Sequence, residues 1–264
     1  MYHPSTAPLD CKSKRREFRA AQRSSFIGVA AALAFSATSA NGQNLITNGS
    51  FEAAGTTGVN SFTTWQKENI PSNSPASVIA YNSTAAYPTS AFGESVTPDN
   101  NALSASPDPV GTRGAYLVGD FSQNETIFQH TYLTPGNYRL GFSSYLTANG
   151  LANANNSRIS VQIIGIPVAS TNITGSSTGR TWTNNSGVGS ISVAGYYKTA
   201  LVFNSNGNPA KDVVIDRVYA IRTNDPATIA IPGTPSFVPE PSSAMLLMGG
   251  LTASGLIRRR TRTA

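Results

Sequence analysis

The chain has 264 residues and a formal net charge of +6. A charge of this size could indicate nucleic-acid binding, but its distribution excludes that class of partner. Of the 19 basic residues, six lie in the first 23 positions and four in the last seven, whereas residues 41–238 hold nine Lys or Arg against ten Asp or Glu. The basic character therefore belongs to the two ends, and the long middle is close to neutral.

The first 40 residues have the pattern of an export signal. A basic stretch precedes the small and apolar run 26–35, and residues 36–40 supply the small side chains at which a signal peptidase cuts. We expect cleavage after Ala40. Residues 14–18 loosely match the twin-arginine export motif, but their distance from the apolar run favours the general secretory route. The alternative, a buried helix over 26–35, is disfavoured by the charges that precede it.

The single cysteine, Cys11, falls within the segment that we expect to be removed. The mature chain is then expected to have no disulfide, no thiolate metal site and no cysteine nucleophile. The remaining length, on the order of 200 residues, is enough for one sizeable β domain and does not require two. Such a fold must be held together by its hydrophobic core alone.

Residues 41–237 have a β rather than an α composition, because Asn, Ser, Thr and Gly fill the intervals between short apolar runs. Apolar and polar residues alternate in the clearest runs, so that Tyr138, Leu140 and Phe142 share one face of a strand. The expected strands are 77–81, 115–119, 126–132, 138–143, 159–163, 189–193, 199–204 and 213–221. Turns or loops separate them without helical crossovers, which predicts an all-β fold, a single antiparallel β-sandwich.

One interval between expected strands, residues 88–114, is too long for a turn. Its prolines, glycines, asparagines and serines predict an extended surface loop. Such a loop could bind a ligand, or it could be an insertion with no role of its own, and the sequence leaves both alternatives open.

Four pieces of the sequence carry a resemblance to a known family. They are Asn-Leu-Ile-Thr-Asn-Gly-Ser-Phe-Glu at 44–52, Trp65, the segment 128–142 that ends in Leu-Thr-Pro-Gly-Asn-Tyr-Arg-Leu-Gly-Phe, and Val-Ile-Asp-Arg-Val at 214–218. In this order the pieces resemble carbohydrate-binding modules with the galactose-binding-like, jelly-roll fold. The resemblance implies a jelly-roll β-sandwich over residues 41–222 and a polysaccharide as a partner.

The same resemblance implies a structural calcium ion between the first and last strands. The family's ligand positions correspond to Glu52 and Asp216, and carboxylate oxygens are the ligands that Ca²⁺ prefers. Two alternatives stay open. The two residues could be ordinary carboxylates at strand ends, and Arg217, which stands where the family tends to have a second acidic residue, could pair with a neighbouring carboxylate in place of a metal.

Carbohydrate binding needs an aromatic face on which a sugar ring can stack. Trp182 has polar neighbours on both sides and is the first candidate, and Trp65 is the second. Since most aromatic residues of a sandwich are core residues, burial is the alternative for each of them.

Catalytic patterns are largely missing from the expected mature sequence. One histidine, His130, remains, and it lies in an expected strand without a nucleophile-elbow motif nearby. Several carboxylates could supply a glycosidase pair: Glu94, Asp99, Asp108, Asp120 and Glu125. Ten acidic residues in a domain of this size form accidental pairs, however, so we expect a protein without enzymatic activity.

The C-terminus combines a rigid motif, a short apolar segment and a basic cluster. The motif is formed by Val238, Pro239, Glu240, Pro241 and Ser242. The fifteen uncharged residues that follow would span about 22 Å as a helix, which is short for about 30 Å of bilayer hydrocarbon. The flanking arginines can extend the helix by snorkelling and would stay on the cytoplasmic side: Arg258, Arg259 and Arg260.

This three-part ending over 238–264 resembles the PEP-CTERM sorting signal that exosortase, a membrane-embedded processing enzyme of Gram-negative bacteria, recognises. The resemblance implies an exosortase-type partner, a transient inner-membrane stage and delivery to the cell surface or an extracellular polysaccharide matrix. A plain C-terminal membrane anchor is the alternative. Residues 223–237 hold three prolines and few apolar groups, which predicts a linker between the domain and the signal.

Together these features predict a non-enzymatic exported surface or matrix protein whose β-sandwich binds carbohydrate. Two alternatives stay open. A purely structural or adhesive matrix component would need no glycan site, and a secreted hydrolase could use the same scaffold.

Overall fold

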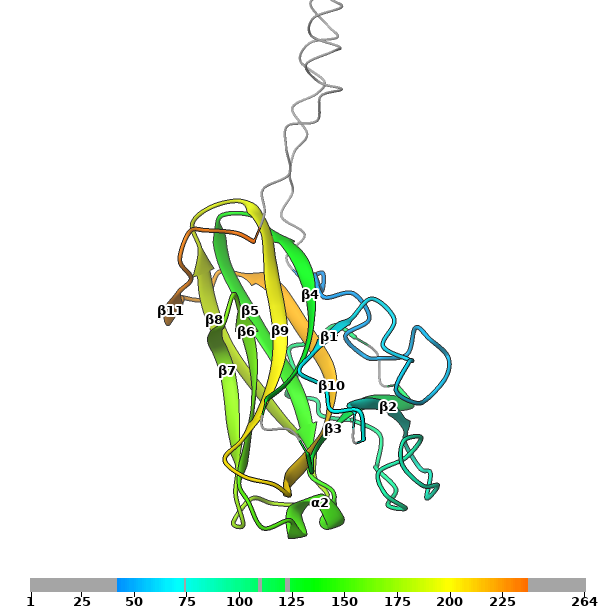
Figure 1. The fold of residues 1–264 in the computed structure, drawn as a ribbon. Coiled ribbons are helices and arrows are strands. Elements are labelled where there is room, and N and C mark those ends of the chain that lie inside the picture. Colours follow the sequence, from blue (N-terminus) through cyan, green and yellow to red (C-terminus); the bar gives the residue numbers. More distant parts are fainter. Residues whose placement is uncertain (1–41, 74, 109–110, 122–123, 237–264) are drawn as a thin grey trace, which may run out of the picture. The chain divides into compact units, whose positions relative to one another are not determined.

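The computed structural model describes residues 42–236, apart from residues 74, 109–110 and 122–123. Two β-sheets pack face to face in this part of the chain (Figure 1). The five-stranded sheet has the order β1 (Gln66–Glu68), β4 (Asn124–Leu133), β9 (Gly195–Ser205), β6 (Ser157–Ile163) and β7 (Ile166–Ile173). The six-stranded sheet has the order β11 (Ile229–Ala230), β8 (Thr183–Ile191), β5 (Gly136–Tyr145), β10 (Ala210–Thr223), β3 (Arg113–Gly119) and β2 (Ser77–Ala80).

Neighbouring strands of both sheets pair antiparallel, except that β11 runs parallel to β8. One short helix, α2 (Ala148–Ala152), packs against β10. The expected all-β, single antiparallel β-sandwich of the jelly-roll type is confirmed.

The main hydrophobic core lies between the two sheets and follows the alternation of the strands. On β6, Ile159, Val161 and Ile163 are at most 1% exposed, and on β5, Leu140 and Phe142 are fully buried. Because successive side chains of a strand point to opposite faces, the intervening residues lie on the outer faces of the sandwich. What covers those outer faces therefore decides which surface is available to a ligand.

A second hydrophobic cluster covers the outer face of the six-stranded sheet. Tyr116, Tyr145 and Val214 project from the sheet and are at most 2% exposed, because Ala91 and Val96 of the long loop before β3 pack over them. The predicted long loop is thus present, and Ala91 and Val96 attach part of it to this sheet.

The predicted export signal (1–40), the C-terminal sorting motif with its transmembrane helix and the arginine cluster lie outside the described residues. Among the described residues, no helix has the length and apolar character needed to cross a membrane. The segment predicted as a linker lies partly on the sandwich, since Ile229–Ala230 pair with β8 and Ile231 is 3% exposed.

Candidate functional site

A group of polar contacts surrounds Glu52, one of the two predicted calcium ligands. Its Oε1 accepts hydrogen bonds from the backbone N–H groups of Thr112 and Arg113, both at 2.6 Å. Its Oε2 accepts from Arg113 Nη1 at 2.8 Å. Glu52 therefore fastens the start of β3 to the N-terminal segment, and a guanidinium supplies the positive charge.

Asp216, the other predicted ligand, lies on β10 and is fully buried. Burial raises its pKa well above the usual range, against the hydrogen bonds that it accepts from Arg217 N at 2.6 Å and from Tyr81 Oη at 2.9 Å. The negative charges of Asp99 and Glu52 raise the pKa further. Asp216 thus lies near two other acidic groups.

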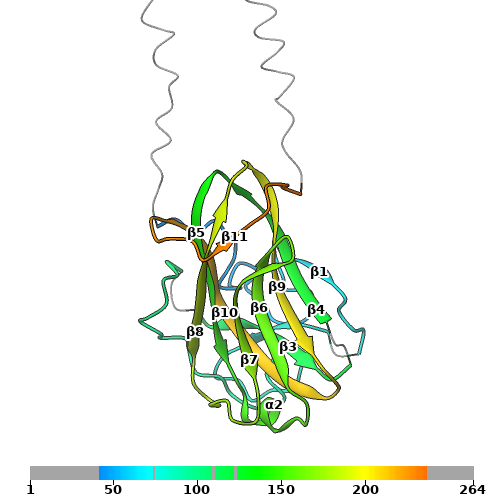
Figure 2. The same ribbon diagram turned by 90° about the vertical axis from the view of Figure 1, so that its left-hand side faces the viewer.

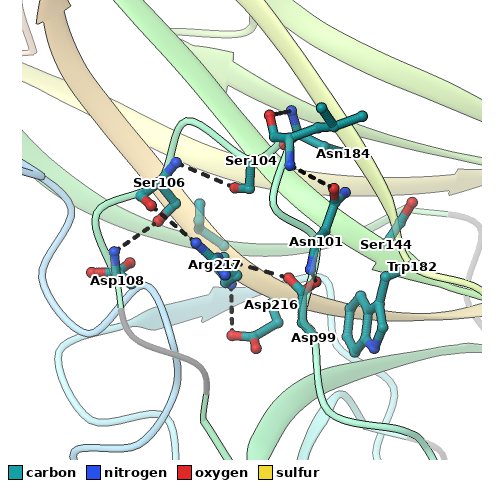
Figure 3. A network of polar contacts seen from close by, with 12 residues as sticks. Asp99, Asn101, Ser104, Ser106, Asp108, Ser144, Trp182, Asn184, Asp216 and Arg217 are labelled. Carbon is teal, nitrogen blue, oxygen red and sulfur yellow. Dashed lines mark hydrogen bonds and ion pairs between the residues drawn. The ribbon is translucent and has the colours of Figure 1, made fainter.

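Arg217 connects this region to the long loop (Figure 3). It adopts a left-handed backbone conformation, with φ of 51°, inside the register shift between Asp216 and Tyr219 of β10. Its Nη2 donates to the Ser106 carbonyl at 3.0 Å, and its Nε lies 3.8 Å from Asp99 Oδ2, a fully buried carboxylate. Arg217 therefore forms an ion pair, too long for a hydrogen bond, with the loop carboxylate.

These contacts do not fit a calcium site. The carboxylates of Glu52 and Asp216 are engaged by N–H and O–H donors, and Arg113 and Arg217 bring positive charge to the positions next to them. No group of three or more Asp, Glu, His or Cys side chains within the described part of the chain is arranged to hold a metal ion. Of the sequence alternatives, the guanidinium in place of a metal matches the observed contacts best.

The two tryptophans predicted to stack on sugars both pack against other aromatic rings. Trp65 is 6% exposed and stacks on Phe51 at 5.6 Å, so its faces lie in the core. Trp182 is partly buried between Tyr81 and Tyr145, with ring centroids at 5.7 and 5.4 Å, and its Nε1 donates to the Thr97 carbonyl at 2.7 Å. Trp65 therefore attaches the N-terminal segment to the sandwich, and Trp182 attaches the long loop.

Two buried carboxyl groups lie at the end of the sandwich where β4 begins. Glu125 is fully buried, and neither of its oxygens has a hydrogen-bond partner within the described residues. Burial, with the nearby charges of Asp212 and Asp120, raises the pKa of Glu125 to about 9. Asp212 is 2% exposed, accepts hydrogen bonds from Tyr116 Oη at 2.8 Å and Gly119 N at 2.9 Å, and has a pKa raised by burial to about 7.

Strands β4, β9, β6 and β7 of the five-stranded sheet lie side by side (Figure 2). Their outer face has exposed side chains toward both of its ends: Asn124, Arg158 and Asn172 toward one, and His130 and Tyr132 toward the other. The register places residues of β4, β9, β6 and β7 in rows across it. One row holds Asn124, Asn204, Arg158 and Asn172, because Asn124 pairs with Asn204, Arg158 pairs with Asn204, and Asn172 pairs with Arg158. Three amides and one guanidinium thus lie side by side on one face.

The aromatic residues of this face lie toward its other end. Tyr132 is 45% exposed and meets Tyr196, its partner on β9, with ring centroids 5.2 Å apart. Between this pair and the amide row, Lys198 lies over the ring of Phe128 at 4.2 Å and forms an ion pair of 2.5 Å with Glu68. His130, the one histidine of the expected mature sequence, is an exposed residue of the same strand face.

A cavity of about 410 Å³ opens at the amide end of the face. Its lining consists of four asparagines, three serines or threonines, and Arg158. Amide groups both donate and accept hydrogen bonds, and the hydroxyl groups do the same, which suits a ligand that carries many hydroxyls. From Asn124 to Tyr132 the face extends about 27 Å at about 3.4 Å per residue, so it could accommodate an extended chain.

Sequence reasoning missed this face. Tyr132 was part of a predicted strand and was not considered for stacking, although alternation with the buried Ile127 and Leu133 places it on the outer side. The same alternation places Asn204 and Arg158 outward from their strands. What the sequence did not reveal is that these strands are neighbours, because β9 enters the sheet between β4 and β6.

No protein-family model and no curated protein sequence matches the chain. Among solved structures, TmCBM61 in complex with beta-1,4-galactotriose is 18% identical, with a TM-score of 0.43 over 69% of this chain and 99% of that one. An apo-form cyclase from Fischerella sp. is 16% identical, with a TM-score of 0.46 over 70% of this chain and 96% of the cyclase.

A further solved structure, a family 16 carbohydrate-binding module, is 18% identical, with a TM-score of 0.36 over 68% of this chain and 100% of that one. At these identities and TM-scores the likenesses carry no argument about function. The chain is an antiparallel β-sandwich protein, and what its site can bind follows from its own residues.

Proposed function

We propose that the sandwich binds a polysaccharide on the outer face of the five-stranded sheet. The observation that carries this proposal is the combination, on one face, of the exposed Tyr132, packed on the half-buried Tyr196, with the row of amides around Arg158. Aromatic faces stack on the apolar sides of sugar rings, and amide groups bond ring hydroxyls. On the opposite outer face, the long loop covers the part of the six-stranded sheet around Tyr116 and Tyr145.

Binding of the purified full chain to a broad array of polysaccharides and oligosaccharides tests this function. We expect binding to at least one polymer, and a loss of about tenfold or more in affinity for Tyr132→Ala, since a stacked aromatic contributes on the order of 1–2 kcal/mol. Phe92→Ala is the matched control, because Phe92 is 43% exposed but lies on the loop over the other sheet. Equal binding by both variants, or no binding by the parent chain, would refute the proposal.

We also propose that the protein is exported, held in the inner membrane through its C-terminal segment, and processed at its PEP-CTERM-like motif for delivery to the cell surface or matrix. The sequence of 238–264 and the signal-like first 40 residues support this proposal. The protein is proposed to act without enzymatic activity. The cavity at the amide row has no carboxylate in its lining, and the buried Glu125 is fully shielded from solvent.

Alanine replacement of Pro239, Glu240 and Pro241 in a host that carries the processing enzyme tests the sorting proposal. The parent chain is expected to lose mass and leave the membrane fraction, whereas the variant is expected to stay in that fraction at its unprocessed mass. If both reach the same location with the same mass, the motif has no sorting role.

A further inference from the structure

Arg158 differs from most other cations of the sandwich in its electrostatic surroundings. The ion pairs within the described residues join Arg113 to Glu52, Arg139 to Asp225, Arg180 to Glu94, Lys198 to Glu68 and Arg217 to Asp99. Arg158 belongs to none of these pairs. Its Nη2 donates one hydrogen bond of 2.9 Å to Ser170 Oγ, a neutral group on the adjacent strand.

The position of Arg158 on β6 explains why its guanidinium is available. Its neighbours across the sheet are Asn204 on one side and Asn172 on the other, and both are uncharged. The side chain is exposed and forms part of the lining of the 410 Å³ cavity, whose other lining residues are asparagines, serines and a threonine. A single positive charge is thus set among neutral hydrogen-bonding groups.

We infer that this cavity takes an acidic sugar residue, with the carboxylate of a uronic acid on Arg158 and the ring hydroxyls on the surrounding amides. This inference rests on the proposed function and names the chemical class of its ligand. A guanidinium presents parallel N–H donors that match a carboxylate in a bidentate arrangement, and charged hydrogen bonds of this kind are stronger than neutral ones. The amides of Asn172 and Asn204 can both donate to and accept from hydroxyl groups.

Charge along the rest of the face agrees with this assignment. Lys198 is already neutralised by Glu68, so the middle of the face carries little net charge. Arg158 therefore binds an acidic sugar unit at one end of the face. The tyrosine pair at the other end stacks on a further sugar unit, which can be neutral or acidic. A polymer in which uronic acids occur among other sugars would satisfy both ends.

Calorimetric titration of the full chain with three polymers tests the inference: polygalacturonate, the same polymer with its carboxyl groups reduced to alcohols, and a sulfated dextran. Polygalacturonate is expected to bind at least about tenfold more tightly than the reduced polymer, the effect of one charge-assisted contact. Arg158→Gln is expected to remove that difference. Arg158→Lys keeps the positive charge but loses the two parallel N–H donors of the guanidinium, so it is expected to remove most of the difference in affinity.

Arg180→Gln is the matched control, because Arg180 is an exposed arginine on another part of the molecule. This control separates a specific contact at Arg158 from the general attraction between a polyanion and a chain with basic ends. Equal weakening by Arg158→Gln and Arg180→Gln, or preference for sulfated dextran over polygalacturonate, would overturn the assignment of a uronate. Equal binding of polygalacturonate and its reduced form would overturn it while leaving the proposed function intact. If no polymer, charged or neutral, binds the parent chain, the proposed function itself fails.

Discussion

Replacing Glu125 with glutamine is expected to remove much of the pH dependence of this protein's stability. Glu125 is fully buried at the start of β4, and its oxygens have no hydrogen-bond partner within the described residues. A buried carboxylate without partners is costly to ionise, so the folded protein keeps the group protonated where the unfolded chain would release the proton. The folded pKa of about 9, against an ordinary value of 4.5, expresses this preference.

The sign of the effect follows from proton linkage. Between pH 4.5 and about 9 the folded state holds a proton at Glu125 that the unfolded state has lost, so the free energy of unfolding falls as the pH rises. One proton corresponds to about 1.4 kcal/mol per pH unit, which amounts to about 2.7 kcal/mol between about pH 5.5 and 7.5. Asp212, whose pKa burial raises to about 7, adds a further decrease over the lower part of this range.

Urea unfolding of the parent chain and of Glu125→Gln at several pH values between about 5.5 and 7.5 measures this slope. In the variant, the free energy of unfolding is expected to fall less steeply with pH, by about 1.4 kcal/mol per pH unit, the contribution of one proton. This holds whatever the variant's stability at a single pH, because the cost of burying an amide does not depend on pH. Glu68→Gln, which removes an exposed carboxylate, controls for the change in net charge. Parallel curves for the parent chain and Glu125→Gln would show that Glu125 is ionised in the folded protein and would refute the reasoning.

Three other substitutions or treatments test the contacts around the long loop. Arg217→Ala is expected to lower the free energy of unfolding by about 3–5 kcal/mol because it leaves the buried Asp99 charge without its partner, and adding Asp99→Asn should restore part of the loss in a double-mutant cycle. Trp182→Ala is expected to cost about 3 kcal/mol by removing the ring that packs under the loop, as measured by denaturant unfolding, and a glycan-binding loss without a stability loss would contradict this role. A calcium chelator is expected to leave the melting temperature unchanged, because Glu52 and Asp216 already have other partners, and a calcium-dependent rise would contradict that conclusion.

The elements of the fold that are local in sequence could be predicted. Alternation identified the buried side of 138–142 and 159–163, because a strand's own residues determine which side chains share a face. Turn residues at 134–137 were enough to separate β4 from β5. Each of these features depends on neighbours along the chain, and so each is visible in a single sequence.

The features that depend on long-range pairing could not be predicted. The row that joins Arg158 to Asn204 exists because β6 and β9, which lie far apart in sequence, are neighbours in the sheet. Trp182 was predicted to be a stacking residue from its polar sequence neighbours, yet its ring packs on Tyr81 and Tyr145 under the loop. Polar neighbours in the sequence therefore indicate an exposed side chain only where no segment from elsewhere in the sequence packs over it.

The segment 223–237, predicted to be a linker from its composition, includes a short strand of the sandwich. The prolines of 223–237 indicate an extended segment, but an extended segment can add a strand to an open sheet edge, as β11 does beside β8. Ile231 is then 3% exposed and lies beside Gly189 of β8. A proline-rich composition therefore excluded a helix here without excluding contact with the domain.

The long loop determines which face of the sandwich is left for a ligand. Glu94 accepts hydrogen bonds from Ala148 N at 2.8 Å and Asn149 N at 3.0 Å, which fastens the loop to the start of α2. Asp99 fastens it to Arg217 on β10. Uncovering the six-stranded sheet would break both attachments and expose the cluster around Tyr116 to water, at a cost of hydrophobic burial as well as of paired charges. Because the outer face of the five-stranded sheet needs no such opening, a ligand can reach Tyr132 and the amide row in the folded protein as it stands.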